Sequence, residues 1–182
     1  MIKQLKFFWI LLFCLTISAC GFQMRSAADF PSSLRPLYFS SVRPYSLLSV
    51  SLRELFNAMH APLTKTANDA RFSIFISQDH FIYSRPDTVD ATLPTSIGFS
   101  QIATINIQDN QTKKTLLTKK FTTSDSLTLN ANQIYTANSN DLMRQELNHE
   151  MISLIYYWLI SKNTTDVLNH HAANTKTTRR AS

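Results

Sequence analysis

Alternating apolar and polar residues predict four strands in the middle of the chain. The first, residues 37–42, is short and is followed by Pro44, which cannot donate a hydrogen bond to a sheet. Residues 71–83 alternate in their first half, apart from Phe75, and residues 97–109 alternate more fully, as half-buried strands do. Residues 112–124 form the fourth strand, and the short polar turn before them predicts an antiparallel hairpin with the third.

Two further segments repeat their apolar residues at helical spacing. In residues 46–60 the repeat comprises Leu48, Leu52, Leu55 and Met59. Pro62 ends this first helix. In residues 138–161 the stripe is longer and comprises Leu147, Met151, Leu154, Ile155, Trp158 and Leu159. Residues 127–136, which precede this second helix, fit neither period and are left open.

The order strand, helix, three strands, helix predicts an α+β fold. Elements with one apolar face bury it by packing as two layers, so we expect a two-layer sandwich: a mixed four-stranded sheet with both helices on one face. The first strand-helix-strand unit should be a right-handed crossover, which makes that strand pair parallel. The domain would span residues 37–161, preceded by a tether at residues 20–36. Residues 162–182 are polar and aperiodic, which predicts a disordered tail.

The N-terminus has the features of an export signal. Lys3 and Lys6 precede an uninterrupted apolar run, FFWILLFCLTI, at residues 7–17. Eleven residues are too few to span a hydrocarbon core of about 30 Å, but they fit the hydrophobic region of a signal peptide. Residues 1–19 are therefore predicted to be a signal peptide that is removed from the mature protein.

The residue after the predicted cut is Cys20, and the residues before it resemble a bacterial lipobox: Ile17, Ser18 and Ala19. Cleavage needs small residues at this point, and lipidation needs a thiol, so Cys20 is predicted to be the lipidated residue. Several acyl chains anchor a protein stably in a bilayer. The alternative is an ordinary signal peptide or an N-terminal anchor with an incidental cysteine. Position 21 is Gly rather than Asp, and by resemblance to enteric lipoproteins this implies the outer membrane.

Composition narrows the function classes. Hydrophobic residues make up 44% of the 182 residues and only two are glycine, which argues for a packed core and against fibrous or wholly disordered proteins. The net charge is +6, and loss of Lys3 and Lys6 with the signal peptide leaves about +4, a mild bias toward anionic partners. There is no dense Arg/Lys stripe with interleaved aromatic residues, so nucleic acid is not expected as a partner.

No catalytic or metal-binding motif is recognisable. With Gly21 and Gly98 as the only glycines, a phosphate loop or a nucleophile elbow is nearly excluded. There is no cysteine cluster, and no pair of histidines has the helical spacing of a hydrolytic zinc site among His60, His80, His149, His170 and His171. We therefore expect a binding protein without cofactor or metal, not an enzyme.

Three stretches behind the lipobox resemble the LPS-assembly lipoprotein family, LptE. These are residues 20–25 (CGFQMR), residues 48–63 (LSVSLRELFNAMHAPL) and residues 130–159, where a polar stretch leads into a long amphipathic helix. The resemblance implies a plug in the lumen of the outer-membrane barrel LptD, which assists barrel assembly and contacts lipopolysaccharide during its delivery to the outer leaflet. The competing interpretation is another outer-membrane lipoprotein, either an activator of peptidoglycan synthesis or a secretion pilotin.

The predicted hairpin carries four lysines: Lys113, Lys114, Lys119 and Lys120. Ammonium groups bind phosphate as point charges, so these lysines and Arg85, in the preceding loop, are candidates for contact with lipid A phosphates. The resemblance to the LptE family implies that basic residues near this hairpin and in the preceding loop contact lipopolysaccharide. Alternatively, the lysines only protect a sheet edge from aggregation. Candidates for the surface that meets the barrel are four aromatic residues expected to be exposed: Tyr38, Tyr45, Phe81 and Tyr83.

Overall fold

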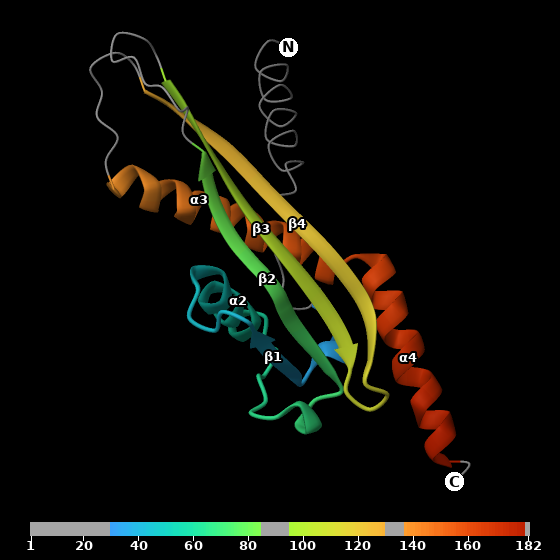
Figure 1. Ribbon diagram of the computed structural model, residues 1–182. Helices are drawn as coiled ribbons and strands as arrows, with labels where there is room; N and C mark the ends of the chain where they lie inside the picture. Colours follow the sequence, from blue (N-terminus) through green and yellow to red (C-terminus); the bar gives the residue numbers. More distant parts are fainter. Residues whose placement is uncertain (1–29, 85–94, 130–136, 181–182) are drawn as a thin grey trace, which may run out of the picture.

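The computed structural model describes residues 30–84, 95–129 and 137–180. The longer elements follow in the order β1 (Leu37–Ser41), α2 (Leu47–Ala58), β2 (Phe72–Ser84), β3 (Thr95–Asp109), β4 (Lys114–Leu129), α3 (Ala137–Leu159) and α4 (Lys162–Arg180) (Figure 1). Two short 3-10 turns complete the list: Ser32–Leu34 precedes β1, and Ala67–Asp69 lies between α2 and β2. Residues 127–129, left open by the sequence, extend β4.

The four strands form one mixed sheet, as predicted. Their order is β1-β2-β3-β4; β1 runs parallel to β2, and the other two pairs are antiparallel. The parallel pair is joined through α2, so the predicted parallel strand-helix-strand connection is confirmed. The hairpin β3–β4 is also confirmed, and it gives the sheet its two longest strands.

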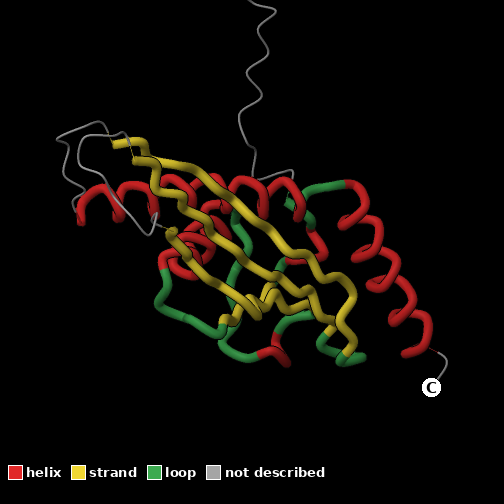
Figure 2. Tube along the Cα trace, turned by 45° about the horizontal axis from the view of Figure 1, so that its top comes forward, coloured by secondary structure: helices red, strands yellow, loops and turns green. Residues whose placement is uncertain are grey.

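Helices α2 and α3 lie on the same face of the sheet and contact each other (Figure 2). The main apolar core lies between these layers and contains Leu52 and Phe56 of α2, Ile74 and Ile105 of the sheet, and Ile155 of α3. The predicted two-layer α+β sandwich is therefore confirmed. Ser46 caps α2, because its side-chain oxygen accepts a hydrogen bond from the backbone N–H of Ser49.

A bulge in β2 changes which residues face the helices. The register to β3 shifts between Ile76 and Gln78, which leaves Ser77 without a Cα partner. Up to Ile76 the even-numbered residues face the core, whereas beyond the bulge Asp79 and Phe81 do so, because one extra residue inverts the alternation. The alternation predicted for the first half of residues 71–83 is therefore confirmed, and the bulge is the reason that it does not continue through the second half.

The predicted tether at residues 20–36 is wrong from Phe30 onward. Phe30 and Leu34 are buried in the main core, and the Phe30 ring packs edge-on against Phe56 with centroids 6.1 Å apart. Isolated apolar residues among prolines and serines carry no periodic signal. Their burial follows from a surface that only the folded domain supplies.

The predicted disordered tail, residues 162–182, is also wrong, because residues 162–180 form helix α4. Thr164 and Leu168, four positions apart and so on one face of the helix, are fully buried. Arg71 also connects α4 to the rest of the domain, because its Nη2 donates a hydrogen bond to the backbone oxygen of His171 at 3.0 Å. A mostly polar helix of this kind is stabilised by docking, which composition does not reveal.

Within the described ranges, no helix combines the length and the apolar composition needed to cross a bilayer.

Candidate functional site

The structure splits the four hairpin lysines into two pairs. Lys113 lies in the turn, in the left-handed backbone region with φ 58°, and Lys114 opens β4. Lys119 and Lys120 lie five and six residues further on, about 16–20 Å away along an extended strand. Lys119 pairs with Ile105 and Lys120 with Thr104, so the two side chains leave opposite faces of the sheet. The hairpin therefore does not present a single four-lysine cluster.

A groove lies beside the second pair, between β4 and the C-terminal half of α3. This β4–α3 groove has a volume of about 460 Å³ and is lined by Lys119, Lys120, Phe121, Thr122, Leu154, Tyr157, Trp158 and Ser161. The ammonium nitrogen of Lys119 lies 5.2 Å from the centroid of the Phe121 ring. Leu154 and Tyr157 are 40% and 56% exposed, so the groove offers apolar surface beside positive charge.

Two predicted site residues, Cys20 and Arg85, lie outside the described residues.

Of the four aromatic residues predicted to form a contact surface, two are exposed and two are partly buried. Tyr45 is 91% exposed and Tyr83 is 52% exposed, as predicted, while Tyr38 is half-buried. Phe81 is not an outward-facing residue. The bulge turns it toward the helices, where it packs against Phe99 with ring centroids 6.1 Å apart.

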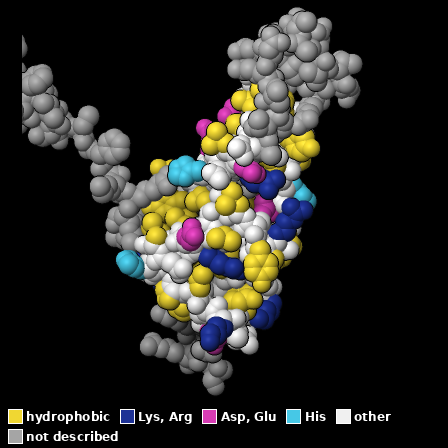
Figure 3. All heavy atoms as spheres, turned by 90° about the vertical axis from the view of Figure 1, so that its left-hand side faces the viewer, with side chains coloured by type: hydrophobic (Ala, Val, Ile, Leu, Met, Phe, Trp, Pro, Cys, Tyr) yellow, Lys and Arg dark blue, Asp and Glu magenta, His cyan; other side chains and the backbone are white. Residues whose placement is uncertain are grey.

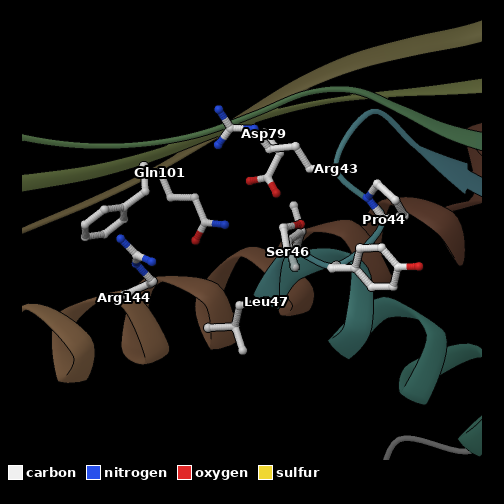
Figure 4. A pocket seen from close by; sticks show the side chains of 10 residues that line it. Arg43, Pro44, Ser46, Leu47, Asp79, Gln101 and Arg144 are labelled. Atoms are coloured by element: carbon white, nitrogen blue, oxygen red, sulfur yellow. The ribbon is translucent and has the colours of Figure 1, made fainter.

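A second hollow, not predicted from the sequence, lies at the N-terminus of α2. This α2 pocket has a volume of about 530 Å³ and lies between the β1–α2 loop, the middle of β2 and β3, and α3 (Figure 4). Asp79 and Gln101 extend into it from the sheet, and Arg144 extends into it from α3 (Figure 4). Arg43 and Tyr45 lie at its loop side.

The two sheet residues of the α2 pocket are buried and polar. Asp79 is 6% exposed and Gln101 is 4% exposed. The side-chain oxygen Oε1 of Gln101 has no hydrogen-bond partner. Asp79 shares the pocket with the guanidinium groups of Arg43 and Arg144. The sequence held one signal for this site: Gln101 occupies an apolar-face position between Phe99 and Ala103.

The histidines do not form a common site among the described residues. In the part of the chain that the structure describes, no three His, Cys, Asp or Glu side chains lie close enough to hold a metal ion. His60 occupies the left-handed turn after α2 with φ 52°, and His80 and His149 are exposed. The rings of His170 and His171 on α4 lie 5.9 Å apart.

Positive charge is not concentrated on the face seen in Figure 3, where Lys and Arg side chains alternate with hydrophobic and acidic ones. An anion on this face would therefore be bound by local geometry and not by a broad basic surface.

No protein-family model and no curated protein matches the chain. Solved structures do match it, at low identity. The uncharacterized lipoprotein B from Nitrosomonas europaea matches over 83% of this chain and 97% of its own, with 15% identity and a TM-score of 0.53. A minor lipoprotein from Acinetobacter baumannii matches over 76% and 93%, with 16% identity and a TM-score of 0.47. Rare lipoprotein B from Shewanella oneidensis matches over 80% and 99%, with 16% identity and a TM-score of 0.41. At these identities, what the chain shares with the Nitrosomonas lipoprotein is its fold.

Proposed function

We propose that this protein is a lipid-anchored lipoprotein on the periplasmic face of the outer membrane. It would complex with the LptD barrel as a plug, supporting barrel assembly and the delivery of lipopolysaccharide to the outer leaflet. The observation that carries the proposal is the lipobox ending in Cys20, placed before a domain whose fold is that of a bacterial lipoprotein. The proposal assigns no catalytic step to the protein.

The surface of the domain suits a plug. Large apolar side chains more than half exposed occur on the β1–α2 loop, on the end of β2 and on α3: Val42, Tyr45, Ile82, Tyr83, Leu142 and Tyr157. A plug meets its barrel around most of its circumference, so contact residues distributed over several elements are what this role requires. Tyrosine supplies such contact area at low entropic cost.

The β4–α3 groove suits a phosphorylated lipid. Lys119 and Lys120 offer ammonium groups to phosphate, while Leu154 and Tyr157 offer apolar surface beside them. Lipid A has both chemistries in one molecule, since its phosphates lie next to its acyl chains. Lys113, Lys114 and Arg85 remain candidates for a more distant contact along the same hairpin.

Affinity purification of the full-length, tagged protein from detergent-solubilised membranes tests the plug. We expect a large barrel protein to copurify in a stoichiometric amount, because a plug buries an extensive surface. Cys20→Ala should recover less of the complex, since the unanchored protein meets the barrel less often. Recovery without a barrel would overturn the proposal, and recovery with a peptidoglycan synthase or a secretion channel would favour the competing adaptor role.

Charge reversal in the β4–α3 groove tests lipopolysaccharide contact. Lys119→Glu or Lys120→Glu, each made singly, should weaken binding to lipopolysaccharide micelles about tenfold, which is the loss of one charge-assisted contact. The matched control is Lys65→Glu, which makes the same charge change at an exposed site away from the groove. Equal losses in all three variants would mean that only overall charge matters and would remove the site.

A further inference from the structure

We propose that the α2 pocket binds an anionic sugar, a pyranose ring that carries a carboxylate or a phosphate. This inference goes beyond the proposed function, because it assigns a second site with different chemistry. The α2 pocket shares no lining residue with the β4–α3 groove. On α3, Arg144 of the pocket and Leu154 of the groove are ten residues apart, which is about 15 Å of helix.

Asp79 and Gln101, which form the floor of the pocket, interrupt the apolar face of the sheet. Gln101 pairs with Phe81 on β2 and with Thr123 on β4, and Asp79 is the next core-facing residue along β2. These two polar residues separate two groups of buried apolar side chains. One group is the main core, and the other is a smaller cluster of Ile97, Phe99, Met143 and Leu147. An apolar pair at these two positions would join the clusters into one.

Both of these buried residues present hydrogen-bond acceptors to the pocket, and the acceptor of Gln101 has no partner. The carboxylate of Asp79 accepts only, and Oε1 of Gln101 has no partner. Leaving the Gln101 oxygen buried and unpaired is costly, so its retention points to a ligand that donates a hydrogen bond to it. Neighbouring hydroxyl groups of a sugar supply these donors, and the same hydroxyls can accept a bond from the amide N–H of Gln101.

The charged side chains around the pocket favour a negatively charged ligand. Arg144 and Arg43 bring two guanidinium groups, against the single carboxylate of Asp79. The positive end of the α2 dipole lies at the same place, since Ser46, Leu47 and Leu48 line the pocket. Arg144 is held in place over the Phe81 ring, with its Cζ atom 4.7 Å from the ring centroid. Guanidinium groups bind a carboxylate or a phosphate through paired hydrogen bonds.

The rim supplies a flat apolar surface. Tyr45 lines the pocket yet is 91% exposed, so both faces of its ring are open. The C–H groups of a pyranose form an apolar face that can cover such a ring, while the hydroxyls at its edge remain directed to Asp79 and Gln101. A volume of about 530 Å³ admits one sugar and leaves room for a chain to continue outward.

The binding test uses the purified lipidated protein in detergent, with calorimetry and saturation-transfer NMR as readouts. Glucuronate should bind with a Kd on the order of 1 mM, and glucose at least about tenfold more weakly, because glucose lacks the anion. Inorganic phosphate and glutamate are the other probes. Equal binding of glucose, or binding of phosphate alone, would overturn the inference, and tighter binding of glutamate would replace the sugar with an amino acid.

Two variants locate the ligand. Gln101→Leu should abolish detectable glucuronate binding while leaving the melting temperature unchanged or higher, since it removes an unpaired buried amide. Arg144→Gln, at an exposed position, should weaken binding about tenfold. The control is Arg53→Gln on α2, whose guanidinium lies over Phe39 at 5.7 Å but outside the pocket. Binding that survives in both pocket variants would overturn the site.

Lipopolysaccharide micelles distinguish a free sugar from one attached to a lipid. If the lipid-linked sugar is the ligand, the pocket variants should weaken micelle binding as well as glucuronate binding. Loss of micelle binding in Lys120→Glu but not in Gln101→Leu, together with no binding of glucuronate, would remove the sugar site and leave the proposed function intact. If the barrel does not copurify but glucuronate still binds, the plug function is overturned and the sugar site stands, because glucuronate binding does not require the barrel.

Discussion

Replacing Phe56 with alanine should lower the free energy of unfolding by about 3–5 kcal/mol, the cost of a cavity where a buried aromatic ring stood. Phe56 is fully buried on α2. Its ring meets Phe39 of β1 edge-on with centroids 5.4 Å apart, and it also meets Phe30 at 6.1 Å. One side chain therefore joins α2, the sheet and the segment that precedes β1.

The measurement is chemical denaturation of the purified domain followed by far-UV circular dichroism. Phe56→Leu should cost about 1–2 kcal/mol, because leucine refills part of the space. Leu47→Ala is the control on the same helix, since Leu47 is 40% exposed and should contribute little. A loss below about 1 kcal/mol in Phe56→Ala would show that α2 does not pack on β1 as described.

Replacing Arg71 with methionine should cost about 3 kcal/mol and release α4 from the body of the domain. Arg71 Nη2 lies 3.0 Å from Oδ2 of Asp109, whose side chain is fully buried. The same nitrogen donates to the backbone oxygen of His171 at 3.0 Å. Methionine keeps the packing of the side-chain stem but leaves a buried carboxylate without its counter-charge. The backbone N–H of Gln111 still donates to Oδ1 of Asp109 at 2.8 Å, which keeps the loss at the lower end of the usual range.

Hydrogen exchange followed by mass spectrometry separates the two consequences. Backbone amides of residues 164–172 should exchange faster in Arg71→Met, while those of α3 keep their protection relative to global unfolding. Arg71→Met/Asp109→Leu should recover part of the lost stability, because no buried charge then lacks a partner. Arg53→Met serves as the control for loss of an arginine elsewhere. Unchanged exchange in α4 would show that Arg71 does not hold this helix.

If both the β4–α3 groove and the α2 pocket bind as proposed, the protein contacts one lipopolysaccharide molecule, or two, through different chemistries. Ammonium and apolar groups in the groove suit the phosphorylated lipid, and planar polar groups in the pocket suit sugar hydroxyls. The single-site variants described above address each contact separately, since the sites share no residue. Additive losses in the combined variant Lys120→Glu/Arg144→Gln would indicate independent contacts.

The amino-acid sequence by itself determined the elements that local periodicity encodes. Strand alternation gave the four-stranded mixed sheet, helical stripes gave α2 and α3, and the order of elements gave the parallel crossover. These features follow from which side chains share a face within one element, and such sharing is a property of neighbouring residues. The predicted export signal and lipidation site are local in the same sense, since they depend on a short run around Cys20.

Only the tertiary structure decided the features that depend on partners remote in the chain. The bulge between Ile76 and Gln78 is set by pairing with β3, and it turns Asp79 and Phe81 toward the helices. Helix α4 and the burial of Phe30 depend on surfaces that exist only after the sheet and the other helices have assembled. The α2 pocket has the same origin. Its two arginines, its buried acid and its buried amide come from four separate segments of the chain, and their spacing in the sequence does not predict that they lie together.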